Sequence, residues 1–320
     1  MPASEFAVFY FCPCRERSRW VIYRRLQKID TIFESVTIAF FFTNHYTEDE
    51  PNLERVAPVQ TFDFTGKVAI VTGGGGGIGR EACLKLAAGG ANVVVADLSD
   101  ELGEETAGKI RENGGEAIFV RTDVSKSKDV QHYVRTALDT YGKIDILLNN
   151  AGWEGKMKPL IDYPEEVFDK LMGINVRGVF LGMKYVLPHM ISQKSGTIVN
   201  TASVAGLVGT PEMVAYGASK HAVIGMTKTA GIEAAPSGVR VNAVCPGVVD
   251  TEMMRKIESG FAGGDSAAAE QTRQQMAASA PTGRYTQPEE VANVLLYLAS
   301  DLSSHIIGQT VVIDGGAVLS

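Results

Sequence analysis

The sequence has few cysteines, no long apolar run and no excess of positive charge. Its four cysteines (Cys12, Cys14, Cys83 and Cys245) are too few and too scattered for a disulfide framework, and no Cys/His spacing typical of zinc occurs in the 320 residues. No apolar run is long enough to span a bilayer. The net charge of −7 gives no general attraction to nucleic acid or to anionic lipid. We therefore expect a cytoplasmic protein with no metal, no nucleic-acid partner and no membrane partner.

Residues 1–61 contain no glycine at all, and the first glycine is Gly66. This segment is rich in Phe, Tyr and Arg, and its six Arg and Lys residues before position 40 weakly resemble an organellar transit peptide. Four acidic residues in the same stretch argue against that interpretation. The sequence therefore predicts a poorly ordered N-terminal extension of unknown role over 1–61, and a single folded domain over 62–320.

From Phe62 onward, short apolar runs alternate with longer segments of helical period. The runs of strand type are 68–71, 92–96, 117–121, 144–148, 197–200, 240–244 and 310–313, and the helical segments are 78–88, 101–112, 128–140, 165–190, 214–234 and 288–298. This alternation is typical of a parallel sheet that helices cover on both faces. We expect an α/β domain with a doubly wound, seven-stranded parallel sheet, the Rossmann fold.

A run of five glycines follows the first predicted strand directly, and a helix is predicted right after it. Glycines allow positive φ angles and let the backbone approach a pyrophosphate, whose charge then lies against free N–H groups at the helix N-terminus. Strand, loop and helix in this order predict a dinucleotide site. We expect it at Gly73, Gly75, Gly77, Ile78 and Gly79.

Asp97 ends the second predicted strand, where a carboxylate can accept hydrogen bonds from an adenosine ribose. The same charge would repel a 2′-phosphate, and neither the loop nor residues 98–100 supply an Arg or Lys to compensate. The one basic residue nearby is Arg80, at the start of the helix. Asp97 could instead cap the next helix, but Ser99 can do that. The pattern favours NAD over NADP.

Tyr216 and Lys220 are four residues apart in a predicted helix and therefore share one face. A neighbouring ammonium favours phenolate and lowers the pKa of a tyrosine, which makes the side chain a usable proton shuttle. Such a pair is weak evidence alone. Ser203, however, stands just past a predicted strand, at a carboxyl end where doubly wound sheets bind ligands.

Together, Thr72–Gly79, Asn149-Asn150-Ala151-Gly152, Ser203, Tyr216-x-x-x-Lys220 and Pro246-Gly247 resemble the short-chain dehydrogenase/reductase family, from about Phe62 to the end of the chain. The resemblance implies that Tyr216 is the general acid/base, and that Lys220 lowers its pKa and binds the nicotinamide ribose. Ser203 would hydrogen-bond the substrate oxygen, and Asn175 would hold a water in the proton relay.

The resemblance also implies further cofactor contacts and a homotetramer. Besides Tyr216 and Lys220, these contacts are Asp123, Val124, Asn150, Ala151, Gly152, Pro246, Gly247, Val249 and Thr251. The Gly- and Met-rich segment between Thr251 and Arg284 would be a mobile substrate lid. Five consecutive glycines depart from the family's usual mixture, which includes a Ser, Thr or Arg, and leave the backbone alone to bind phosphate.

The sequence therefore predicts an NAD-dependent oxidoreductase that interconverts an apolar secondary alcohol, cyclic ones included, with its ketone. One alternative is an NADPH-dependent enzyme similar to the 3-oxoacyl reductases, against which Asp97 argues. Another is a non-catalytic NAD-sensing protein, against which the intact set of Asn175, Ser203, Tyr216 and Lys220 argues. Enoyl reductases of the family space Tyr and Lys seven apart, and position 223 here is Val.

Overall fold

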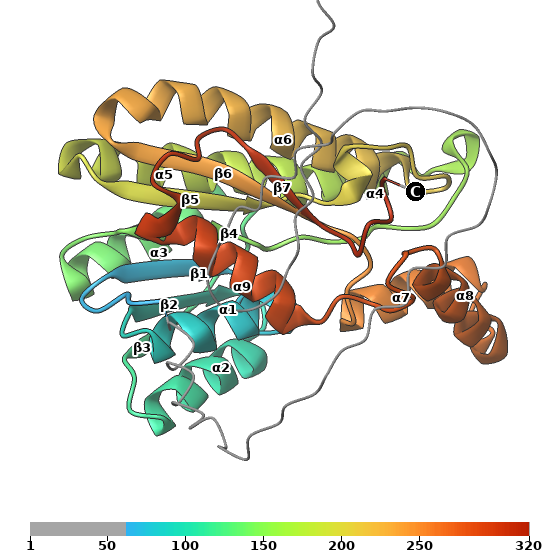
Figure 1. Cartoon of the computed structure of the whole chain (residues 1–320), viewed down its shortest axis with the longest axis horizontal. Coiled ribbons are helices and arrows are strands. Elements are labelled where there is room, and N and C mark those ends of the chain that lie inside the picture. Colours follow the sequence, from blue (N-terminus) through green and yellow to red (C-terminus); the bar gives the residue numbers. More distant parts are fainter. Residues whose placement is uncertain (1–61, 320) are drawn as a thin grey trace, which may run out of the picture. The chain divides into compact units, whose positions relative to one another are not determined.

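The computed structural model describes residues 62–319, so the predicted extension over 1–61 lies outside the described residues. These residues form an α/β domain in which one parallel sheet lies between two layers of helices (Figure 1). The sheet has seven strands in the order β3-β2-β1-β4-β5-β6-β7. They are β1 (Val68–Thr72), β2 (Asn92–Asp97), β3 (Ala117–Arg121), β4 (Ile146–Asn149), β5 (Gly196–Thr201), β6 (Val239–Pro246) and β7 (Thr310–Ile313). The predicted Rossmann fold is confirmed, and each strand overlaps its predicted range.

The strand order reverses beside β1, which pairs with β2 on one side and with β4 on the other. Val68 stands opposite Asn92 of β2, while Ala69 stands opposite Ile146 of β4. The chain leaves β1 toward one face of the sheet and β4 toward the other, which opens a crevice at the carboxyl ends of these two strands. A ligand of a doubly wound sheet binds at this point.

Side chains of β1 alternate between two apolar cores, one on each face of the sheet. Ile70 packs in the core with buried side chains of α3, α5 and α6, whereas Ala69 and Val71 pack in the core with those of α1, α2 and α9. Both cores are buried because helices cover each face, so β1 and β4 at the centre are nearly continuous apolar runs. The helices are α1 (Gly77–Ala88), α2 (Asp100–Glu112), α3 (Ser127–Tyr141), α5 (Gly178–Gln193), α6 (Val214–Ala234) and α9 (Pro288–Ala299).

The single helix predicted over 165–190 is wrong in one respect. The segment contains α4 (Glu165–Met172), a π-helical turn (Gly173–Arg177) and α5 in succession. A π-helical turn holds an extra residue and rotates the side chains that follow it, and the apolar period does not reveal such a turn. Asn175 lies in this turn.

The predicted lid segment folds into two helices that the sequence analysis did not predict, α7 (Glu252–Phe261) and α8 (Ser266–Ala278), which lie next to one another beyond the end of β6 (Figure 1). Each begins at a capping side chain. Thr251 accepts a hydrogen bond from the Met254 N–H (3.3 Å), and Asp265 accepts from the N–H groups of Ala267 and Ala268. Within residues 62–319, no helix combines the length and the apolar character needed to cross a membrane.

Candidate active site

The glycine loop between β1 and α1 needs its glycines for both conformation and space. Gly73 and Gly77 have φ angles of +65° and +49°, which other residues rarely adopt. A Cβ on Gly73 would approach the Ala151 Cα to 2.9 Å, and a Cβ on Gly79 would overlap the carbonyl oxygen of Gly73. The loop therefore lies tightly against both α1 and the segment after β4, where only backbone fits.

The ends of β1 and β4 are tied together across the crevice. The Thr72 hydroxyl accepts hydrogen bonds from the N–H groups of Asn150 (3.0 Å) and Ala151 (3.1 Å). The Asn150 amide donates to the carbonyl oxygens of Thr72 (3.2 Å) and Gly73 (3.3 Å), and its own oxygen accepts from the Thr201 hydroxyl at the end of β5 (3.3 Å). Asn150 and Ala151, predicted as cofactor contacts, thus brace the glycine loop from the other side of the crevice.

Asp97 holds the glycine loop and does not cap α2. Its Oδ2 accepts a hydrogen bond from the Gly75 N–H (2.8 Å) and its Oδ1 accepts from the Ser99 N–H (2.9 Å). The cap of α2 is Ser99, whose hydroxyl accepts from the Leu102 N–H (3.3 Å). The carboxylate therefore stands beside the loop at the end of β2, the place where a ribose would be recognised.

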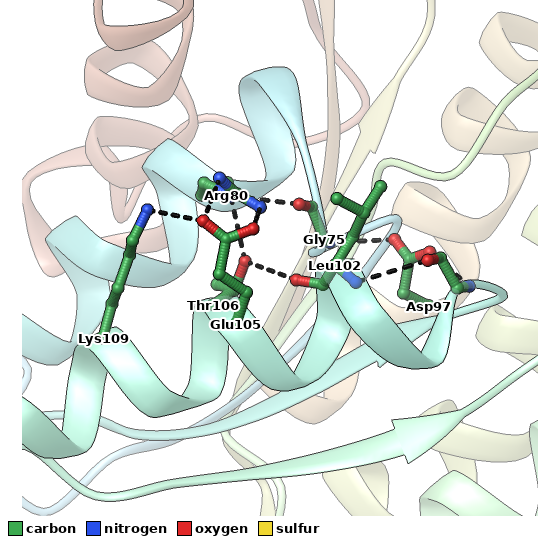
Figure 2. A network of polar contacts seen from close by, with 8 residues as sticks. Gly75, Arg80, Asp97, Leu102, Glu105, Thr106 and Lys109 are labelled. Atoms are coloured by element: carbon green, nitrogen blue, oxygen red, sulfur yellow. Dashed lines mark hydrogen bonds and ion pairs between the residues drawn. The ribbon is translucent and has the colours of Figure 1, made fainter.

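Arg80 holds the same glycine from the opposite direction (Figure 2). Its Nε donates to the Gly75 carbonyl oxygen (3.0 Å) and to the Thr106 hydroxyl (3.1 Å). Its two terminal nitrogens donate to the two carboxylate oxygens of Glu105 on α2, at 3.1 and 2.7 Å, and Lys109 pairs with that carboxylate as well (2.7 Å). The guanidinium nitrogens of Arg80 are thus already engaged and are not free for a second anion.

Ser203, Tyr216 and Lys220 come together at the carboxyl ends of β5 and β6. The Ser203 side chain lies close enough to the Tyr216 hydroxyl to affect its pKa, and the Lys220 ammonium lies 5.5 Å from the centre of the Tyr216 ring. The buried Lys220 Nζ donates to the carbonyl oxygen of Thr201, the last residue of β5 (2.8 Å). The three predicted catalytic side chains therefore form one cluster, which α6 and the end of β5 position.

Burial governs the pKa values of this cluster. Loss of solvent raises the pKa of Tyr216 to about 12, although the nearby Ser203 side chain acts in the opposite direction. Burial also lowers the pKa of Lys220 to about 8. The Tyr/Lys spacing predicted a lowered pKa for Tyr216. In the structure this pKa is raised, because desolvation of the phenol outweighs the favourable contacts.

Asn175 is buried in the π-helical turn and ties the segment after β4 to α6. Its Oδ1 accepts from the Trp153 N–H (2.8 Å), and its Nδ2 donates to the Trp153 carbonyl (2.9 Å) and to the Ser219 hydroxyl (3.1 Å). A Cβ placed on Gly152 would lie 3.5 Å from the Asn175 oxygen and 3.7 Å from the Lys220 Nζ. Asn175 and Gly152 therefore belong to the same cluster as Lys220.

The remaining predicted cofactor contacts lie around the crevice in differing roles. Asp123 accepts from the Ser125 N–H (3.0 Å) and hydroxyl (2.6 Å), which shapes the turn after β3. Val124 lies against Gly178 at the start of α5, and Pro246 offers its carbonyl oxygen to the Ser203 hydroxyl (3.4 Å). Ile78 and Val249 pack in the core under α1 and α9, Ile78 partly and Val249 fully buried. The Gly247 N–H donates to the Ile313 carbonyl oxygen (2.9 Å). The Thr251 methyl group lies 3.3 Å from the position that a Cβ on Gly77 would take.

The residues present fit a dinucleotide. The narrow backbone cradle of Gly73 and Gly79 excludes side chains, and neither a capping side chain nor an acidic residue of the first turn occupies the N-terminus of α1. Asp97 supplies the hydrogen-bond acceptor for a ribose at the far end of the loop. In the described part of the chain, no three His, Cys, Asp or Glu side chains are grouped so as to hold a metal.

Two groups of residues near the crevice escaped the sequence analysis. Glu105 pairs with Arg80 across 25 positions of sequence, and only the packing of α1 on α2 brings them together. Arg273 of α8 binds both Asp250 (3.1 Å) and Glu258 (3.2 Å), which joins α7 and α8 to the loop after β6. No sequence pattern marks these residues, because each contact depends on tertiary packing.

Comparisons with known proteins give relatives that match this chain over nearly their whole length. A family model described as Enoyl-(Acyl carrier protein) reductase matches residues 73–318. The chain is 40% identical over 255 residues to a 2,5-dichloro-2,5-cyclohexadiene-1,4-diol dehydrogenase of Sphingobium indicum, covering 79% of this chain and 98% of that protein. It is 39% identical over 254 residues to a 3-oxoacyl-(acyl-carrier-protein) reductase of Thermotoga maritima, covering 79% and 98%. The crystal structure of an NAD+-bound xylitol dehydrogenase has a TM-score of 0.77 and 40% identity, covering 79% of this chain and 99% of that one.

Proposed function

The chain belongs to the short-chain dehydrogenase/reductase family, and we propose that it is an NAD-dependent enzyme that interconverts an apolar secondary alcohol, open-chain or cyclic, with its ketone. As a member of that family it is an oxidoreductase that uses a nicotinamide cofactor and acts on CH–OH groups. The observation that carries the proposal is the cluster of Ser203, Tyr216 and Lys220 beside the glycine loop. Turnover of secondary alcohols with NAD+, and its loss when Tyr216 is changed to Phe, tests the proposal.

The cluster divides the proton chemistry among its members. In oxidation the Tyr216 oxygen takes the proton of the substrate hydroxyl, and the Ser203 hydroxyl donates a hydrogen bond to the substrate oxygen as charge develops there. Because burial favours the neutral phenol, Tyr216 depends on nearby positive charge to form phenolate, and Lys220 supplies it. Asn175 holds the Trp153 backbone and Ser219 in place, and it would bind the water that passes the proton on.

NAD supplies the hydride acceptor, and in its oxidised form a positive charge, when it is bound. Gly73, Gly75, Gly77 and Gly79 would receive the pyrophosphate on their backbone, with the open N-terminus of α1 directed toward its charge. Asp97 would accept hydrogen bonds from the adenosine ribose, and Lys220 would bind the nicotinamide ribose. The xylitol dehydrogenase with NAD+ bound supports the choice of NAD.

We expect the enzyme to use NAD+ better than NADP+ in kcat/KM by about fivefold to several hundredfold, because two negative groups at about 4 Å repel by about 1–4 kcal/mol. Changing Asp97→Asn keeps the shape of the side chain and removes its charge. This variant should lower the ratio of kcat/KM for NAD+ to kcat/KM for NADP+ by about tenfold or more, chiefly because the KM for NADP+ falls. Steady-state kinetics with both cofactors measures the ratio.

The matched control for this prediction is Asp100→Asn, which removes an exposed negative charge at the start of α2, paired with Arg121. It should leave the cofactor ratio unchanged. Adding Glu105→Gln to Asp97→Asn releases the terminal nitrogens of Arg80 and should improve NADP+ use again. A wild-type preference for NADP+ would overturn the role given to Asp97.

Burial lowers the pKa of Lys220 to about 8. The binding of NADH should therefore weaken as the pH rises through about 8. Lys220 carries its positive charge below that pH and loses it above, so its attraction for the dinucleotide is present at low pH and lost at high pH. An attraction of about 1 kcal/mol corresponds to roughly fivefold weaker binding when it is lost. Fluorescence titration of NADH across this range measures the change. The Lys220→Met enzyme should bind NADH weakly at every pH. If its affinity for NADH falls with rising pH as steeply as that of the wild type, Lys220 is not the group that causes the pH dependence.

An NADPH-dependent reductase of 3-oxoacyl substrates is the second candidate, and the relative from Thermotoga maritima favours it. Asp97 argues against it, since the carboxylate stands where a 2′-phosphate would bind and Arg80 is engaged by Glu105. A faster rate with NADPH and a 3-oxoacyl thioester than with NADH and any simple ketone would favour this candidate. The homotetramer, the cytoplasmic location and the extension over 1–61 stay predictions.

A further inference from the structure

Glu154 is a buried carboxylate whose hydrogen-bonding capacity is largely unused. It follows the Asn150-Ala151-Gly152-Trp153 segment after β4 and is 9% exposed. Among residues 62–319, its own backbone N–H is the one hydrogen-bond donor that acts on its carboxylate. A buried carboxylate normally has several partners, because burial without them costs free energy. The Glu154 oxygens are not among the fully enclosed polar atoms that lack a partner in residues 62–319, so solvent reaches them, and a ligand hydroxyl can take the place of that water.

The position of Glu154 places this acceptor beside the reaction centre. Trp153, its neighbour, is held by two hydrogen bonds to Asn175, at 2.8 and 2.9 Å. The charge of Glu154 acts on the Tyr216 hydroxyl and raises the pKa of that tyrosine. The carboxylate thus lies within electrostatic range of the atom that takes the substrate proton.

The lid helix α7 borders Glu154 as well. The Glu154 carboxylate interacts with Lys256, which lowers its pKa, and with Glu252, which raises it, while burial raises that pKa most. Met157, three residues further on, packs against α7 so closely that a Cβ on Gly260 would stand 2.5 Å from its sulfur. The chain neighbours of Glu154 contact both Asn175, which belongs to the same cluster as Lys220, and α7, so Glu154 stands between that cluster and α7.

The charges around Glu154 favour a neutral partner over a cation. Lys256 already supplies positive charge to this carboxylate, and it is held to Glu252 at 3.0 Å. A ligand ammonium would have to compete with that lysine, whereas a hydroxyl can fill the open acceptor positions without adding charge. A hydroxyl also matches a site in which Tyr216 and Ser203 bind another hydroxyl of the same molecule.

We propose that Glu154 binds a second hydroxyl of the substrate, close to the carbon that reacts, and so selects diols, polyols and hydroxyketones over simple alcohols. The inference rests on the proposed function, since Tyr216 defines which carbon reacts. It narrows the substrate class from secondary alcohols in general to those with a neighbouring hydroxyl on an otherwise apolar chain or ring. Glu154 is then the residue that discriminates among substrates.

Matched pairs of alcohols test this inference. The pairs are cyclohexanol with vicinal cyclohexanediol, and butan-2-ol with butane-2,3-diol. Calorimetry of their binding to the wild-type enzyme with NADH, a complex that cannot oxidise an alcohol, reports selection without turnover. Since a hydrogen bond to a charged group contributes about 1.5–3 kcal/mol, the diols should bind at least about tenfold more tightly than the simple alcohols. The kcat/KM values with NAD+ should show the same preference.

Three variants separate the possible outcomes. Glu154→Leu should abolish the diol preference and leave binding of the simple alcohols equal or better, while Glu154→Gln, which keeps an acceptor, should retain part of the preference. Glu252→Gln, an exposed neighbour on α7, should retain all of it. Equal binding of diols and simple alcohols by the wild type would overturn the inference, as would equal losses for both in Glu154→Leu.

Two further results distinguish this inference from its premise. Tighter binding of 2-aminocyclohexanol than of the diol, lost in Glu154→Gln, would overturn the assignment of a neutral partner. If the wild type selects diols in the calorimeter but oxidises no alcohol with NAD+, the proposed function fails and the assignment of Glu154 as a hydroxyl-binding residue stands.

Discussion

Changing Tyr216→Phe should lower kcat for alcohol oxidation by about 10³-fold, within the range of 10²–10⁴ that general acid–base groups contribute. The change removes one oxygen and keeps the ring that lies 5.5 Å from the Lys220 ammonium. Because the phenol oxygen is the atom that accepts the proton, the chemical step loses its base while the cofactor cradle at the glycine loop stays intact. Stopped-flow measurement of NADH formation, together with NADH binding by fluorescence, separates the two effects.

The matched control for Tyr216→Phe is Tyr185→Phe, which removes a phenol oxygen that hydrogen-bonds Ser127 on the α3 side of the sheet (2.8 Å). It should change the rate less than twofold. A Tyr216→Phe enzyme that keeps more than about a tenth of the wild-type kcat would rule out Tyr216 as the base. Weakened NADH binding in that variant would show that the tyrosine acts through the cofactor.

Changing Gly79→Ala should weaken NADH binding by roughly ten- to hundredfold and lower the melting temperature. The added methyl group would overlap the Gly73 carbonyl oxygen and stand 2.7 Å from the Asn150 amide nitrogen, so the glycine loop must move. Overpacking at such a site costs about 1–3 kcal/mol, which corresponds to this range of affinity if the loop shifts away from its binding geometry. Fluorescence titration and thermal unfolding measure the two quantities.

Gly76→Ala is the control within the same loop. A Cβ on Gly76 would meet no atom within 4 Å, and the φ angle of −156° suits alanine. Its melting temperature should match that of the wild type. If Gly76→Ala and Gly79→Ala lower the melting temperature equally, close approach of backbone at Gly79 is not what the loop requires.

The strands and the catalytic cluster were predictable because local patterns encode them. Continuous apolar runs mark strands that are buried on both faces, and the Tyr216/Lys220 spacing marks one face of a helix. The π-helical turn was not predictable, since one extra residue changes the apolar period of 165–190 too little to be read. The helix α8 is rich in Ala and has little apolar contrast, so its sequence shows no clear helical period. The helix α7 does separate apolar from charged residues, and the caps Thr251 and Asp265 are visible in the sequence, so the pattern for α7 was present but was not recognised.

Contacts between distant elements explain the rest of what the sequence analysis missed. Arg80 was recognised as the one basic residue near the loop, but its engagement by Glu105 depends on how α1 packs on α2. The pKa of Tyr216 was expected to fall because of Lys220, and it rises because the surrounding core removes water from the phenol. Burial of this kind follows from the whole fold and cannot be read from a spacing of four residues.

The most direct test of the account is the rate of nicotinamide reduction by the purified full chain with NAD+ or NADP+ and a panel of simple, cyclic and vicinally hydroxylated secondary alcohols. We expect turnover with NAD+, turnover with NADP+ that is slower by about fivefold to several hundredfold, and none above background in Tyr216→Phe. Turnover that favours NADP+ would contradict the assignment of Asp97. Tight NAD+ binding with no turnover of any alcohol would contradict the proposed activity itself.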